Sequence, residues 1–138
     1  MRKEGRILRF WFVRHGFRYY QEQPNIISWY KSAAEKSRNL GVFCSMRASD
    51  KVVYYSHESP KGIVGIFEVK SELGEKTIQG NRLSYYYDIS PVFLANGGRE
   101  PQPALMKRII GYCLKPRGTI FELKPDEYKK IKSFLISN

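Results

Sequence analysis

The chain has 138 residues, of which 42% are hydrophobic, and a formal net charge of +11. This length suits one core, so we expect a single domain over residues 1–138, and no apolar run approaches the roughly 20 residues of a membrane helix. With two cysteines and two histidines, the composition excludes a disulfide scaffold and a paired-cysteine zinc site, so we expect no metal and no cofactor.

The first predicted element is a strand over residues 7–14. This run is aromatic and β-branched, is bounded by Gly5 and Gly16, and is apolar on both faces, so we expect it in the middle of a sheet with Trp11 in the core. The basic residues 1–18 lack the apolar region and cleavage site of a secretory signal. We therefore expect a cytoplasmic protein, either a monomer or a weak homodimer.

A helix is predicted next, over residues 26–39. Pro24 and Asn25 precede it, and Ile27, Tyr30 and Ala34 recur at helical spacing. This prediction places Trp29 on a helix.

Two strands at residues 52–56 and 63–69 then form a hairpin, in which Gly65 lets another backbone approach. Residues 84–94 form a long strand in which Pro91 indicates an edge or a bulge.

The C-terminal part contains a short helix or irregular segment at 104–114 and a short strand at 119–123. An amphipathic helix follows from Pro125, with acidic residues in its first turn and an apolar face formed by Tyr128, Ile131, Phe134 and Leu135. Because no strand–helix–strand rhythm runs through the chain, these elements favour an α+β fold. We expect a small, partly open mixed β-barrel of about five or six strands with flanking helices.

The positive charge is concentrated in two segments. Residues 1–47 hold 10 Lys or Arg against 3 Asp or Glu, and residues 99–118 hold 5 against 1. If the two segments meet in space they form a face that binds a polyanion, because each neutralised phosphate releases counterions. RNA or DNA is the expected partner, and a generally basic surface is the alternative.

The order of these elements resembles the EVE domain, a member of the PUA-like superfamily and a relative of the YTH domain. The resemblance is carried by the strand with Trp11, by Gly41-Val42-Phe43, by the hairpin strands and by the closing helix at 125–131, and it covers about residues 10–135. It implies a PUA-like barrel that binds a modified or flipped base of DNA or RNA in an aromatic cage. YTH relatives place a tryptophan in that cage where this chain has Phe43, which offers a smaller stacking surface.

A site for an extruded base needs a stacking ring, hydrogen-bonding groups for the base edge and cations for the flanking phosphates. We expect Phe43 to stack on the base, Ser45 and His15 to read its edge, and Trp29 to add a second ring. The residues predicted to contact phosphates are Arg14, Arg47, Lys115 and Arg117.

Two other functions compete with this interpretation. The chain is alternatively an RNA-binding accessory domain without base selectivity, or a small metal-independent ribonuclease with His15 or His57 as general base and an arginine on the phosphate. Because the sequence gives the two histidines no fixed spacing to a partner carboxylate, we expect a binding module and assign no catalytic residue.

Overall fold

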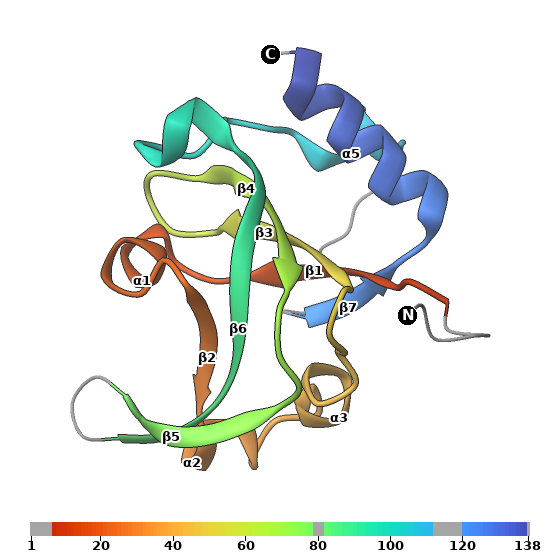
Figure 1. The fold of residues 1–138 in the computed structure, drawn as a ribbon. Helices are drawn as coiled ribbons and strands as arrows, with labels where there is room; N and C mark the ends of the chain where they lie inside the picture. Colours follow the sequence, from red (N-terminus) through yellow and green to blue (C-terminus); the bar gives the residue numbers. More distant parts are fainter. Residues whose placement is uncertain (1–6, 79–81, 112–119, 138) are drawn as a thin grey trace.

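The computed structural model describes residues 7–78, 82–111 and 120–137. Its strands are β1 (Phe10–Arg14), β2 (Ile26–Tyr30), β3 (Lys51–Ser56), β4 (Gly62–Val69), β5 (Gly74–Ile78), β6 (Arg82–Leu94) and β7 (Ile120–Leu123). Its helices are α1 (Phe17–Glu22), α2 (Lys31–Ala34), α3 (Leu40–Phe43), the 3-10 helix η2 (Ala95–Gly98), α4 (Met106–Ile110) and α5 (Pro125–Ser137). The strands form one curved, mixed sheet, along which β6 extends almost from top to bottom (Figure 1).

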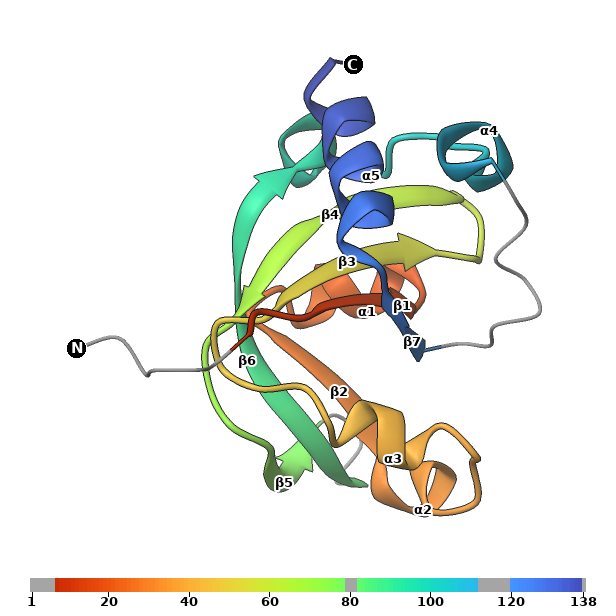
Figure 2. The same cartoon turned by 90° about the vertical axis from the view of Figure 1, so that its right-hand side faces the viewer.

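The expected α+β fold is confirmed, but the sheet is open and has seven strands in the described part of the chain, where a partly open barrel of five or six strands was expected. Its order is β2-β6-β4-β3-β1-β7, with β5 also paired to β6, and no pairing joins β2 to β7 in the part of the chain that the structure describes. Because β1 pairs with β3 on one side and with β7 on the other, it has no free edge for β2. Instead β2 pairs with β6 and diverges from β1 (Figure 2).

Alternating side chains of the central strands fill two cores. Trp11 and Val13 of β1 belong to the first core, which includes residues of α1, β2 and α3, whereas Phe12 between them belongs to the second core beneath α4 and α5. In the same way, Tyr54 of β3 lies in the first core and Tyr55 packs against the second. The period of two thus confirms a central strand with apolar side chains on both faces.

The hairpin and the long strand were predicted correctly. β3 pairs antiparallel with β4, and a Cβ atom at Gly65 would lie 2.5 Å from the carbonyl oxygen of Phe93, so a glycine is needed where β6 approaches. The pairing of β4 with β6 shifts register where Pro91 and Phe93 face neighbouring residues of β4. Pro91 therefore marks a bulge, as expected, although β6 is an internal strand.

The predicted helix over residues 26–39 is wrong in its first half. Ile26–Tyr30 is the strand β2, paired in antiparallel register with residues 84–88 of β6, and only Lys31–Ala34 and Leu40–Phe43 are helical. The run Ile-Ile-Ser-Trp-Tyr is β-branched and aromatic, and pairing with the long strand β6 outweighs the helical spacing. Trp29 therefore lies on a strand.

Candidate functional site

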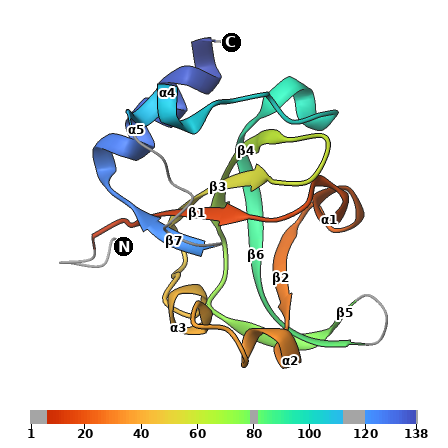
Figure 3. The ribbon, with the colours of Figure 1, turned by 180° about the vertical axis from the view of Figure 1, so that it is seen from behind.

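A pocket of about 310 Å³ lies where β2 diverges from the end of β1. We call it the β1–β2 pocket, and its lining includes Arg14, His15, Tyr19, Gln23, Ser28, Trp29, Tyr30, Tyr54, His57 and Glu58. Seen from behind, α1 and the start of β2 lie beside the end of β1 (Figure 3). A smaller cavity of about 80 Å³ adjoins it and shares Arg14, His15, Ser28 and Trp29.

The end of β1 is held rigidly at this pocket. The backbone N–H of His15 donates to the carbonyl oxygen of Tyr55 over 2.9 Å, so the β1–β3 pairing continues one residue past the strand. Phe17, the first residue of α1, is buried and its N–H donates to Ser56 Oγ over 3.0 Å. His15 is thus fixed between a strand and a helix that are both anchored to β3.

His15 combines a stacked ring with an uncharged edge. Its imidazole stacks on Tyr19, with ring centroids 4.3 Å apart and planes 7° apart. Burial, and to a smaller extent the neighbouring charge of His57, lowers the pKa of His15 to about 4. At neutral pH the imidazole is therefore uncharged and carries one donor and one acceptor, which suits the edge of a base.

The depressed pKa of His15 makes stability depend on pH. Between about pH 6.5 and about pH 4 the unfolded chain binds the proton that folded His15 does not, so stability falls as pH falls through this window. We expect a loss of about 2 kcal/mol in the free energy of unfolding from about pH 7 to about pH 5, measured by urea denaturation. His15→Asn should show a smaller loss, and an unchanged pH slope in that variant would contradict the assignment.

Aromatic rings form much of the pocket wall. Trp29 is partly buried and meets Phe43 edge to face, with centroids 5.7 Å apart. Tyr54 is buried, and its burial raises the pKa of its hydroxyl above the ordinary value, so it stays protonated as a hydrogen-bond donor. Because the Trp29 and Tyr30 side chains are only partly covered, they are the candidate stacking surfaces.

Arginines surround these rings. Arg14 lines the pocket, Arg18 lies over the ring of Tyr19 at 5.3 Å, and Arg82 lies over the ring of Tyr30 at 4.7 Å. Guanidinium groups held over aromatic rings are well placed for both phosphates and bases. Of these three arginines, only Arg14 was predicted from the sequence to contact phosphate. Arg18 could have been added, because it lies in the same short stretch as His15 and Tyr19.

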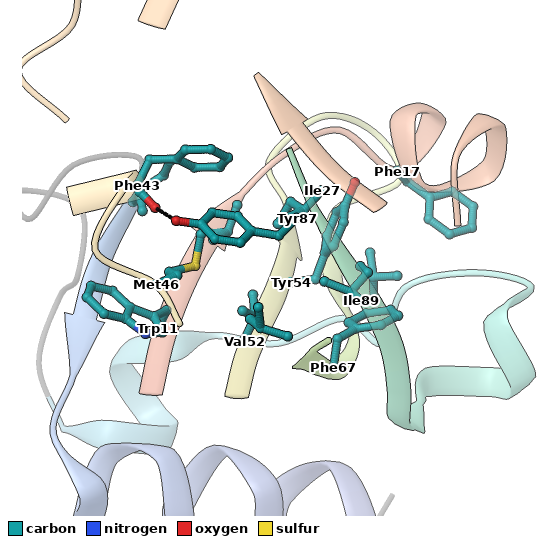
Figure 4. Close-up of a cluster of buried hydrophobic side chains, with 14 residues drawn as sticks. Trp11, Phe17, Ile27, Phe43, Met46, Val52, Tyr54, Phe67, Tyr87 and Ile89 are labelled. Carbon is teal, nitrogen blue, oxygen red and sulfur yellow. Dashed lines mark hydrogen bonds between the residues drawn. The ribbon is translucent and has the colours of Figure 1, made fainter. Parts of the chain in front are cut away.

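Phe43 was the central residue of the predicted site, and the structure corrects its role. Its ring is not presented from a loop for stacking on a base. Gly41-Val42-Phe43 lies in α3, and the Phe43 side chain is 1% exposed. It packs between Trp29 and Tyr87. The Tyr87 hydroxyl donates to the Phe43 carbonyl oxygen over 2.7 Å (Figure 4). The Phe43 side chain lines the 80 Å³ cavity and does not line the β1–β2 pocket.

The other predicted residues are divided among several places. His15, Trp29 and Arg14 meet in the β1–β2 pocket, whereas Ser45 and Arg47 do not line it. Ser45 Oγ donates to the Gly41 carbonyl oxygen over 2.6 Å, and Arg47 pairs with Glu72 at 3.1 Å. Lys115 and Arg117 lie outside the described residues.

One arginine from each basic segment lines a hollow in the described part of the chain, and the two hollows are different. Arg14 of the first segment lines the β1–β2 pocket, but Arg108 of the second lines a separate groove beside α5. His57 lies in the connection between β3 and β4 and also lines the β1–β2 pocket, although the binding interpretation did not include it.

Neither a metal site nor a membrane helix is found within residues 7–78, 82–111 and 120–137. There, no group of three His, Cys, Asp or Glu side chains is arranged to hold a metal ion. None of the described helices combines the length and the apolar character needed to cross a membrane.

An open, PUA-like α+β sheet with an aromatic pocket between β1 and β2 defines the structural class. The fold matches that of the YTH domain of the Zygosaccharomyces rouxii MRB1 protein, solved in complex with N6-methyladenosine RNA, at a TM-score of 0.59 and 13% identity over 93% of this chain and 86% of that one. It also matches the DUF55 domain of human thymocyte nuclear protein 1, at a TM-score of 0.59 and 14% identity over 91% and 97% of the two chains.

A third similar structure is the protein Atu2648 from Agrobacterium tumefaciens, at a TM-score of 0.57 and 18% identity over 89% of this chain and 90% of that one. No protein-family model and no curated protein matches the sequence. At such low identities the likeness establishes the fold, and for the fold the expected resemblance to EVE and YTH domains is confirmed.

Proposed function

We propose that the protein is a nucleic-acid-binding module that holds one extruded base, including a modified one, in the β1–β2 pocket. The observation that carries this proposal is the meeting of the Trp29 ring, the uncharged His15 edge and the Arg14 cation in one hollow. A stacking face, a base-edge reader and a phosphate contact are the three parts that such a site needs.

The pocket volume fits this ligand. At about 310 Å³ it lies at the lower end of the range for small-ligand pockets, roughly 300–1,000 Å³, and so suits a single flat ring system. Because Ser28 and Gln23 also line the wall, both donors and acceptors are available to the base edge. Support comes in addition from a structural neighbour, the Zygosaccharomyces rouxii YTH domain, which was solved with N6-methyladenosine RNA.

The test is binding of short RNA and DNA oligonucleotides that differ in one modified or unmodified base, at two salt concentrations. A base held in a pocket gives a preference for one oligonucleotide that persists at the higher salt concentration, because stacking and base-edge hydrogen bonds do not depend on counterion release. Equal affinity for all oligonucleotides, lost uniformly with salt, would contradict a base pocket and leave a basic surface alone.

One observation favours a second function, metal-independent RNA cleavage. His15 and His57 line the same pocket together with Arg14, although the sequence separates them by 42 residues (57 − 15). A pair of histidines with an arginine can act as general acid, general base and phosphate stabiliser. Cleavage products in the same oligonucleotide panel that disappear in His57→Ala would establish this function, whereas intact oligonucleotides would exclude it.

A further inference from the structure

A second hollow, larger than the β1–β2 pocket, lies on the opposite face of the sheet. This groove of about 950 Å³ is bounded by α4, by α5 and by the β3–β4 hairpin. Tyr54 faces the β1–β2 pocket and the next residue, Tyr55, lines the groove, so the two hollows are separated by the thickness of β3. We call it the α4–α5 groove.

The floor of the groove is apolar. Ile109 of α4 and Phe134 of α5 are partly buried against the second core, and Tyr55 adds its ring from the sheet. Leu105, just before α4, is 64% exposed at the edge. An apolar surface of this kind, left open on a small protein, typically marks a binding surface.

The rim of the groove is positively charged on every side. Lys61 comes from the hairpin, Arg108 from α4, and Lys129 and Lys130 from α5. Among the described residues that line the groove there is no Asp or Glu, and none of the four cations is ion-paired with another described residue. Four cations that form no ion pair with a described residue, around an apolar floor, complement a ligand with apolar side chains and flanking carboxylates.

We propose that the α4–α5 groove binds an acidic amphipathic helix of a protein partner. Apolar side chains of that helix would enter between Leu105, Ile109 and Phe134, while its carboxylates would meet Lys61, Arg108, Lys129 and Lys130. A nucleic acid fits this surface less well, because the stretch from Pro103 to Leu105 and Ile109 of α4 line the groove beside the two rings and offer no side-chain group to a base edge. The groove would thus recruit a protein on the face opposite the nucleic-acid pocket, and this inference does not depend on the proposed function.

The test uses a fluorescent peptide of about 18 residues, about five helical turns, with leucines on one face and glutamates on the flanks. A scrambled peptide of the same composition is the control ligand. We expect saturable binding of the amphipathic peptide, measured by anisotropy, and a loss of about tenfold or more in affinity in the double variant Lys129→Glu/Lys130→Glu. Leu105→Ser, which leaves the charge unchanged, should also weaken binding.

Lys132→Glu and Lys124→Glu are combined as the matched control, because these exposed lysines belong to α5 or immediately precede it but do not line the groove. The proposal is overturned if the peptide does not bind, if the scrambled peptide binds equally well, or if the control variant loses as much affinity as the groove variant. It is also overturned if the groove variant, but not the control, loses oligonucleotide binding, since the groove would then be a nucleic-acid surface.

Discussion

Phe43→Ala is expected to lower the free energy of unfolding by about 3–5 kcal/mol, the usual cost of removing a large buried aromatic side chain. Phe43 is 1% exposed and packs against Trp29 and Tyr87, with ring centroids 5.7 and 5.2 Å away. The alanine would leave a cavity in the first core that the rigid strands cannot fill. Urea denaturation at neutral pH measures the loss directly.

Phe43→Leu is the matched control, because it keeps an apolar side chain of similar size and should cost clearly less. Both variants should bind nucleic acid with almost unchanged affinity per folded molecule at low temperature. A Phe43→Ala protein of wild-type stability with greatly weakened binding would contradict the structure at this position and make Phe43 the stacking ring after all.

Most elements with a strong local signal could be predicted from the sequence. The β3–β4 hairpin, the bulge at Pro91 and the amphipathic face of α5 each follow from residues close together in the chain. Pro91 cannot donate a ladder hydrogen bond, and a period of 3.6 in α5 places Ile131 and Leu135 on one buried face. Such constraints act within a few residues, so no knowledge of the fold is required.

β2 could not be predicted in this way, because its structure is decided by a distant partner. Ile27, Tyr30 and Ala34 have helical spacing, but Ile26–Tyr30 pairs with residues 84–88 of β6, far along the chain. A short run of β-branched and aromatic residues can form a strand or a helix, and the pairing available in the rest of the fold decides between them. β5 was missed for the same reason, since its polar sequence pairs only with β6.

The site depended on the same long-range pairing. Trp29 reaches the pocket only because β2 is a strand that diverges from β1, while Phe43 is buried because α3 packs under β2 and β6. His15 was found because it follows a strand that is obvious in the sequence. The prediction thus named three of the residues that meet in the pocket, Arg14, His15 and Trp29, but it gave the stacking role to Phe43, which is buried.

Trp29→Ala is expected to weaken binding of a single-stranded oligonucleotide roughly 5- to 150-fold, since one base–aromatic stack contributes about 1–3 kcal/mol. Trp29 lines the β1–β2 pocket on the edge strand β2, is only partly buried, and contacts the Phe43 ring edge to face. The loss should fall on the dissociation rate and persist at high salt, because no charge is removed. Surface-bound oligonucleotide kinetics at two salt concentrations measure both quantities.

Trp29→Tyr separates stacking from folding in this experiment. A tyrosine keeps an aromatic face at the same position, so it should recover most of the affinity while filling less of the space beside Phe43 than tryptophan does. If stacking on Trp29 holds the base, affinity follows ring size, from tryptophan through tyrosine to alanine, whatever the stability of each variant. If affinity instead followed the fraction of folded protein in each variant, Trp29 would be a packing residue, and the other partly covered ring of β2, Tyr30 beneath Arg82, would become the stacking candidate.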